Sequence, residues 1–356
     1  MEKRGRHKHT GKRTKGILFL LVLAVFCSLL IAVGLGAVSF GPGTTLRVIA
    51  AQIPALREQF SPDCTALEYN MIWKMRLPRV LLGFIVGASL GTCGVAMQAL
   101  VRNKLADPFI FGVSSGASAF ASLFMVFGVF SFLGRYALPL SAFLGALVSI
   151  VFVYTVSRVR GRIHITQLLL TGVAVAMMMD AVTSLIIVAA PDAFAGHNID
   201  FWLSGSLAGA KWAYLSLPLA VMLLCLTYLL ANYRALNALV LGEETAGTLG
   251  IHVSAKQKSL VLIASLLAGV TISVSGSIGF VGMMAPHISR ILVGADHRKV
   301  LPLSALLGGL AVVWADVAAR MIAAPEEIPV GLMTAFVGAP FFLVMLKSKN
   351  STRTIA

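Results

Sequence analysis

Three ionisable side chains within the apolar stretches of this chain have the chemistry to carry protons across a membrane. Asp180 and Asp316 each lie near the middle of an apolar stretch, and His287 directly follows Pro286. A carboxylate in the centre of a membrane helix costs roughly 2.5–3.5 kcal/mol, so such groups usually face protein or water. Because proton coupling normally uses more than two carboxylates in register, we expect Asp180 and Asp316 to hydrogen-bond to neighbouring helices. An ion-coupled secondary transporter is the alternative interpretation.

Motifs for zinc-dependent hydrolysis or nucleotide binding do not occur in this sequence. Gly11-Lys12 resembles the end of a phosphate-binding loop, but Arg6 stands where the first glycine belongs and Arg13 replaces the required Ser or Thr. No HExxH or paired-aspartate pattern lies on an apolar stretch. We therefore expect no catalytic residue, no metal site and no directly bound cofactor.

The composition is that of a polytopic membrane protein. Of the 356 residues, 58% are hydrophobic and 12% are charged, whereas about 25% of a soluble domain is charged. The net charge of +15 would suit a protein that binds nucleic acid, but the distribution of the basic residues along the chain does not. Seven of the 29 Lys and Arg residues precede Gly16, and others form short clusters between apolar stretches, which is typical of cytoplasmic loops. We expect contact with membrane lipid and none with nucleic acid.

Ten apolar stretches predict an all-α fold of about ten membrane-spanning helices. They are 17–40, 77–100, 112–132, 137–157, 165–190, 213–231, 258–279, 280–294, 301–322 and 328–346. The eighth is short and contains Pro286. An even number of spans places both termini in the cytoplasm, where Lys and Arg are concentrated. The chain thus divides into a basic tail at 1–16, a membrane domain at 17–347 and a C-terminal tail at 348–356.

Two parts of the membrane domain resemble each other. Leu138–Leu147 reads LPLSAFLGAL and Leu301–Leu310 reads LPLSALLGGL. Gly87 and Gly94 in GASLGTCG also match Gly269 and Gly276 in GVTISVSG. Spans 2–5 therefore resemble spans 7–10. Because the copies are five spans apart, they face opposite ways in the membrane, and transporters often place their path at the interface of such inverted repeats.

The longest interior loop, at about 232–257, lies on the cytoplasmic side in this topology. It contains Gly242 and Gly250 among helix-forming residues. The residues that could form its apolar face are Leu239, Leu241, Ala246 and Leu249. A short helix pair with such a face suits the groove of a partner. An amphipathic connector on the membrane surface is the alternative.

Six sequence blocks, in this order, resemble the FecCD-type permease subunits of ABC importers, which move iron-siderophores, haem or cobalamin. The blocks are RLPR at Arg76–Arg79, MQALVRNKLADPFIFGVSSGA at Met97–Ala117, FWLSGSL at Phe201–Leu207, LGEETAGTLGI at Leu241–Ile251, GFVGMMAPHISR at Gly279–Arg290 and EIPVGLMTAFVGAPFF at Glu327–Phe342. The resemblance covers nearly all of 17–347. Lys104 departs from it, because the family usually has proline there.

This resemblance implies a transport subunit, not an enzyme, in the cytoplasmic membrane of a bacterium. Two cytoplasmic ATPase subunits would bind and hydrolyse ATP, and an extracytoplasmic binding protein would deliver the substrate. A second copy of the chain, or a similar permease, would complete a dimer. The substrate would be an iron-siderophore or a related metal chelate such as haem or cobalamin.

The resemblance also assigns the 232–257 loop as the ATPase-coupling segment. The residues involved would be Leu241, Gly242, Glu243, Ala246, Leu249 and Gly250. The two glycines would set the turns, and Glu243 and Ala246 would face the ATPase.

On the outer face, Arg76 and Arg79 match family arginines that receive acidic residues of the binding protein, and Arg320 is a third candidate. Arginine suits this role because its planar fork pairs bidentately with carboxylates. Ordinary anchoring at the membrane interface is the alternative.

A path for large chelates would need wide, weakly binding walls. The fifth and tenth spans offer small and methionine side chains that suit such a lining. The candidates are Gly172, Met177, Met178, Gly331, Met333 and Gly338. Close helix packing is the alternative role for these residues.

Overall fold

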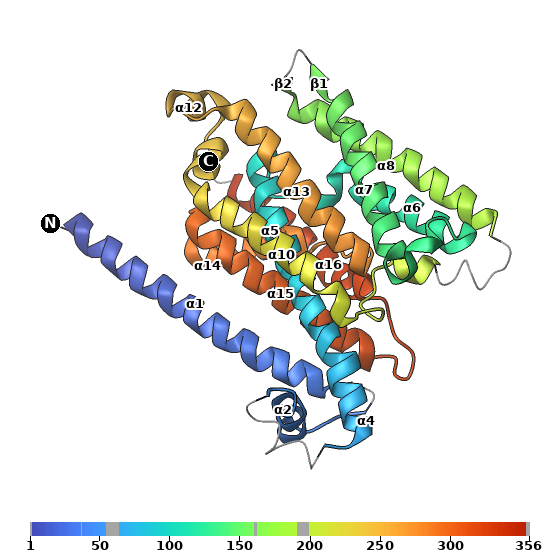
Figure 1. The fold of residues 1–356 in the computed structure, drawn as a ribbon. Helices are drawn as coiled ribbons and strands as arrows, with labels where there is room; N and C mark the ends of the chain where they lie inside the picture. Colours follow the sequence, from blue (N-terminus) through green and yellow to red (C-terminus); the bar gives the residue numbers. More distant parts are fainter. Residues whose placement is uncertain (1, 37, 55–63, 160–161, 191–198, 354–356) are drawn as a thin grey trace.

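The computed structural model describes residues 2–36, 38–54, 64–159, 162–190 and 199–353, and most of them are helical (Figure 1). The helices are α1 (Glu2–Gly34), α2 (Pro42–Ala50), α4 (Ala66–Glu68), α5 (Leu77–Val101), α6 (Val113–Phe127), α7 (Ala137–Val156), α8 (Ile165–Val188), α10 (Ser216–Ala231), α11 (Tyr233–Val240), α12 (Glu243–Thr248), α13 (Val253–Ser275), α14 (Val281–Val293), α15 (His297–Met321) and α16 (Val330–Arg353). A π-helical turn, η1 (Tyr69–Arg76), leads into α5, and short 3-10 turns lie at η2 (Pro108–Phe111), η3 (Ser131–Tyr136) and η4 (Trp212–Tyr214). The strands β1 (Arg158–Val159) and β2 (Arg162–Ile163) pair antiparallel, with Arg158 opposite Ile163.

Ten apolar helices correspond in order to the ten predicted spans, which confirms the all-α membrane fold. Among the described residues, seven are long and apolar enough to cross a bilayer, and α6, α14 and the first part of α16 are shorter. The predicted short eighth span is α14, which has 13 residues and contains Pro286. The first span ends earlier than predicted. Its helix stops at Gly34, because the chain folds back there and the amide of Phe40 donates a hydrogen bond of 2.9 Å to the Gly34 carbonyl.

Helix α5 runs through the middle of the bundle and is buried along most of its length (Figure 1). Pro78 lies in its first turn, where the missing amide proton breaks no helical hydrogen bond. Glycines bring neighbouring helices into backbone contact: a Cβ on Gly87 would lie 2.1 Å from the carbonyl oxygen of Gly308, and one on Gly94 would lie 1.7 Å from that of Gly282. Small residues permit this close approach where burial of apolar surface alone does not drive helices together.

The predicted repeat appears in the way the two halves pack. Helix α5 packs along α15, and its counterpart α13 packs along α7, which is the counterpart of α15. One pair of matching glycines lies at the corresponding helix contact in each half, since Gly87 meets Gly308 and a Cβ on Gly269 would lie 3.4 Å from the Cβ of Ala146. The other pair differs, because Gly94 lies inside α5 against Gly282, and Gly276 ends α13 beside the carbonyl of Trp202. The two central helices α5 and α13 also contact each other, so each half contributes one helix to the core.

The two ends of the bundle carry different connections. Helices α2 and α4 lie at one end, and α12 and the β1–β2 hairpin lie at the opposite end (Figure 1). We call these the outer end and the inner end. This arrangement agrees with the predicted topology, which places 158–164 and 232–257 in the cytoplasm and 41–74 outside.

Candidate functional site

A buried ion-paired cluster joins α5 to α15 at the outer end. Arg79, in the first turn of α5, donates from Nε to Oδ1 of Asp316 at 2.9 Å, and its Nη2 lies 2.8 Å from the same oxygen. Arg320, one turn after Asp316 on α15, places its Nε 3.1 Å from the other carboxylate oxygen. All three residues are buried. A buried charge is tolerated only when it is paired and hydrogen-bonded, and Asp316 has two cations.

Glu327 completes this cluster from the connection between α15 and α16. Both of its carboxylate oxygens accept hydrogen bonds from Nη1 of Arg79 at 2.9 Å. Its side chain is about one-third exposed, at 36%, whereas that of Asp316 is buried. The guanidinium of Arg79 therefore contacts one carboxylate inside the bundle and another at its surface.

The other two arginines of the outer end hold the end of α1. Arg76 donates from Nη1 to the carbonyl oxygen of Gly34 at 3.0 Å and from Nη2 to that of Val38. Arg320 donates to the carbonyl oxygens of Leu35 at 3.1 Å and of Ala32 at 3.3 Å. The last carbonyls of a helix have no partner within it and carry partial negative charge, so cationic donors stabilise them.

The structure therefore brings Arg76, Arg79 and Arg320 together at the outer end, as the topology predicted, and also gives each an internal partner. Their docking role stays a prediction. Asp316 bonds to a neighbouring helix, as expected. Asp180 lies on an exposed side of α8. These two carboxylates thus occupy different environments and form no shared relay among the described residues.

At the inner end, α12 is held by a turn on each side. Gly242 before it has φ of 117° and Gly250 after it has φ of 79°, conformations that favour glycine over residues with a Cβ. The side chains of Leu241 and Leu249 are exposed, at 67% and 62%. Two large apolar side chains therefore flank a short helix on the solvent side.

Ala246 corrects one expectation from the sequence. Its side chain was expected to face a partner, but it is fully buried within the bundle's own apolar core. The reason is the backbone fold, in which the amide of Ile251 returns to donate a hydrogen bond of 3.0 Å to the carbonyl of Ala246. Ala246 thus fixes α12 against the bundle and leaves the leucines outside.

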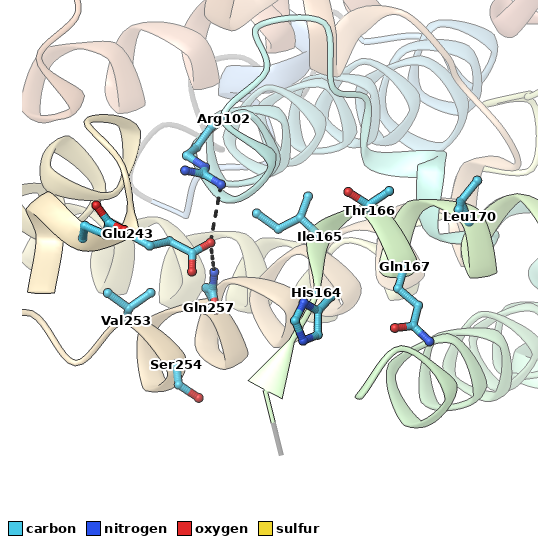
Figure 2. A pocket seen from close by; sticks show the side chains of 11 residues that line it. Arg102, His164, Ile165, Thr166, Gln167, Leu170, Glu243, Val253, Ser254 and Gln257 are labelled. Atoms are coloured by element: carbon cyan, nitrogen blue, oxygen red, sulfur yellow. Dashed lines mark hydrogen bonds and ion pairs between the residues drawn. The ribbon is translucent and has the colours of Figure 1, made fainter. Parts of the chain in front are cut away.

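A polar cluster lies between α12 and the inner ends of α5 and α13 (Figure 2). Oε1 of Glu243 accepts a hydrogen bond of 3.1 Å from Nε2 of Gln257, in the first turns of α13, and lies 3.5 Å from Nη2 of Arg102, which caps α5. These residues form one wall of an open cavity of about 880 Å³. The start of α8, from His164 to Leu170, forms the facing wall.

The candidate path residues separate into two groups. Met177 and Met178 are exposed on α8, and their place in a path stays a prediction. Gly172 lies against the loop before α6, because a Cβ on Gly112 would lie 3.1 Å from the Gly172 carbonyl. On α16, Cβ atoms on Gly331 and Gly338 would lie 2.1 Å from the carbonyl of Ser204 and 2.4 Å from the Cβ of Phe280. Packing explains Gly331 and Gly338, and Met333 is partly buried against the apolar core. The place of Gly172 in a path stays a prediction.

Sequence reasoning missed the partners of the predicted residues. Asp316 and Arg320 are four residues apart on one helix, which is a spacing that brings side chains together, so this pair was predictable. Arg79 and Asp316 are 237 residues apart, and no local pattern connects them. No sequence pattern indicated Arg102 or Gln257 as a partner of Glu243.

Comparison with known proteins identifies relatives along nearly the whole chain. The family described as the FecCD transport family matches residues 20–348. The hemin transport system permease of Yersinia pestis is 34% identical over 94% of this chain and 97% of its own length. The cobalamin import system permease of Halobacterium salinarum is 41% identical over 79% of this chain and 74% of its own.

Solved structures show the same fold. An ABC transporter assigned to the metal-chelate type, in an inward-facing conformation, matches with a TM-score of 0.80 at 31% identity, over 94% of this chain and 99% of that one. The Fe(3+)-citrate import system permease of Bacillus subtilis is similar in sequence, at 34% identity over 97% of this chain and 99% of its own length.

Proposed function

The chain belongs to the FecCD transport family, and on this premise we propose that it forms the membrane path for a ferric siderophore. It is the permease subunit of a binding-protein-dependent ABC importer. ATP hydrolysis on separate cytoplasmic subunits drives transport, and the permease itself performs no chemistry on the substrate. Its place is the cytoplasmic membrane of a bacterium.

One observation carries the choice of substrate. Relatives named for Fe(3+)-citrate, for iron(3+)-hydroxamate and for hemin each share about a third of their residues with this chain over nearly its whole length. Iron chelates are therefore the favoured class. Cobalamin is a second candidate, because the permease named for it is 41% identical over 283 residues.

The partners are assigned to the two ends of the bundle. We place the ATPase subunit at the inner end, against Leu241 and Leu249, because exposed apolar side chains flanking a short helix suit a protein groove. We place the binding protein at the outer end, where Arg76, Arg79 and Arg320 gather. A second permease, identical or similar, completes the assembly.

Uptake by a strain lacking this gene tests the substrate. Cells carrying the gene on a plasmid, with the genes of its binding protein and ATPase, should accumulate radiolabelled iron from a ferric hydroxamate. Cells without it should not. Accumulation of labelled cobalamin alone, with no uptake of ferric hydroxamate or haemin, would replace the siderophore assignment by the second candidate.

Substitutions on α12 test the ATPase contact. Leu241→Asp with Leu249→Asp should abolish co-purification of the ATPase, because charges would enter an apolar contact. Both side chains are exposed, so the permease itself should fold normally. Ala295→Asp, at another exposed inner-end position, is the matched control and should retain the ATPase. Full retention by the double leucine variant would exclude this contact.

A further inference from the structure

We infer that Glu243 joins α12 to the inner ends of α5 and α13 through Arg102 and Gln257, so that a displacement of α12 moves both central helices together. The inference rests on the proposed contact between α12 and an ATPase. It assigns to Arg102 and Gln257 a positioning role in energy coupling that goes beyond membership of the family.

A single carboxylate oxygen makes both connections. Oε1 of Glu243 accepts the hydrogen bond from Nε2 of Gln257 at 3.1 Å and faces Nη2 of Arg102 at 3.5 Å (Figure 2). Glu243 is the first residue of α12, so the junction lies at the turn that begins this helix. Any rotation of α12 about that turn acts on both contacts.

The two partners are constrained by their own helices. Gln257 is buried, and a buried amide that loses its hydrogen-bond partner destabilises the folded state. Arg102 ends α5 with φ of 55° and ψ of 30°. That left-handed conformation is unfavourable for a residue with a side chain, so it persists where surrounding contacts hold it. Neither partner can follow α12 without its own helix.

These helices are the central pair of the repeat. Helix α5 packs along α15 and helix α13 packs along α7, so a force applied to both reaches the two halves of the bundle. The start of α8 lies across the 880 Å³ cavity from the junction. The junction therefore acts on the core, and α8, which carries the exposed methionines, takes no part in it.

Distances between spin labels test whether the three elements move as one body. In the assembled complex, without the native cysteines, labels replace three exposed residues: Thr248 on α12, Asn103 after α5 and Ser254 on α13. With the junction intact, the distances from position 248 to the other two should stay unchanged when ATP is added. In Arg102→Gln the distance to position 103 should change on ATP addition, and in Gln257→Met the distance to position 254 should change. Unchanged distances in both variants would overturn the inference.

Transport per ATP hydrolysed gives the functional readout. In proteoliposomes with ferric hydroxamate as substrate, each variant should keep its ATPase bound and should move less substrate per ATP, by about fivefold or more, which is the lower limit of typical coupling between sites. Glu243→Gln combined with Gln257→Glu exchanges donor and acceptor and should restore part of the loss seen with Gln257→Glu alone. A purely structural role would lower protein yield without this rescue.

Glu244→Ala is the matched control, because Glu244 is the adjacent exposed glutamate and takes no part in the junction. It should couple normally. The outcomes also separate the two proposals. Loss of the ATPase from Arg102→Gln or Gln257→Met would make these residues part of the docking surface and overturn the inference. Retention of the ATPase by the double leucine variant would instead contradict the α12 contact itself.

Discussion

Helix α5 is attached at both of its ends, and the two attachments differ in nearly every physical respect. At the outer end Arg79 lies 2.8 Å from Asp316, and the two side chains are 10% and 2% exposed. At the inner end Arg102 lies 3.5 Å from Glu243, and those side chains are 42% and 45% exposed. Both link a helix of the first half to a segment of the second half. One attachment is fixed in the core, and the other lies in contact with solvent.

The difference in burial determines how much each ion pair contributes to the stability of the fold. Removing one partner of a buried ion pair costs roughly 3–5 kcal/mol, because the other charge is left without compensation. An exposed pair contributes roughly 0.2–1 kcal/mol and is screened by salt. The outer end therefore holds α5 firmly against α15, and the inner contact of α5 with α12 is the weaker attachment. An importer that receives substrate outside and energy inside can use both properties.

Removal of Asp316 gives the largest expected effect. Asp316→Ala leaves the buried cations of Arg79 and Arg320 without their shared carboxylate, so unfolding should require roughly 3–5 kcal/mol less free energy. Thermal unfolding of the purified chain in detergent measures this loss. Asp180→Ala is the control, because Asp180 is an exposed carboxylate of the membrane domain, and it should change stability by less than about 0.5 kcal/mol. Equal effects of the two variants would contradict the contrast.

Asp107 is a partly buried carboxyl group with no cationic partner among the described residues, and it contrasts with the ion-paired Asp316. Asp107 follows α5 at the inner end and accepts a hydrogen bond of 2.9 Å from the Phe109 amide. Burial raises the pKa of Asp107 to about 6. Because the pKa is higher in the folded state than in the unfolded state, the protonated carboxyl favours the folded state. That stabilisation is fully present below the unfolded-state pKa and is lost as pH rises through about 6.

The loss should be measurable in unfolding experiments. The whole shift corresponds to about 3 kcal/mol, and because the carboxyl is partly open to solvent we expect about 1–2 kcal/mol between pH 4 and pH 7. Asp107→Asn keeps the acceptor for the Phe109 amide and does not titrate, so this part of the pH dependence should disappear. The same dependence in both proteins would assign it to another group.

The sequence predicted the fold better than it predicted these attachments. The ten spans follow from the length of apolar stretches, and the repeat follows from matched small residues, because both signals are local. The ion pair of Arg79 with Asp316 and the junction at Glu243 depend on which helices pack against each other. Helix pairing cannot be predicted from the local spacing of residues in a single sequence. Ala246 was misassigned for a related reason: the apolar side of a short helix can face its own bundle or a partner, and only the fold decides which.

A substitution of Glu327 tests whether Arg79 pairs only with residues of its own chain or also with the binding protein. Glu327→Gln removes a negative charge that is about one-third exposed from Arg79, while Asp316 keeps its own contacts. Stability should therefore fall by about 1 kcal/mol. The neutral amide can still accept a hydrogen bond from Nη1 of Arg79 but leaves its positive charge less compensated. Arg79 should therefore pair more strongly with a carboxylate of the binding protein, and affinity for that protein should rise about three- to tenfold, or roughly 0.7–1.4 kcal/mol. Surface plasmon resonance with the detergent-purified complex measures the affinity. Unchanged or weaker binding would place docking away from Arg79.

The smallest expected effect on stability belongs to the inner attachment. Arg102→Gln should lower the free energy of unfolding by less than about 1 kcal/mol, because the pair is exposed and its 3.5 Å separation is long for a charge-assisted hydrogen bond. At an ionic strength of about 1 M the screening length is only ~3 Å, so the difference between wild type and variant should vanish there. The Asp316→Ala deficit should persist in the same salt, since that pair is buried and buried pairs are screened much less. Parallel unfolding curves at low and high salt for the two variants therefore decide the comparison. A salt-independent Arg102 effect, or a salt-sensitive Asp316 effect, would show that the two ends do not differ as their burial indicates.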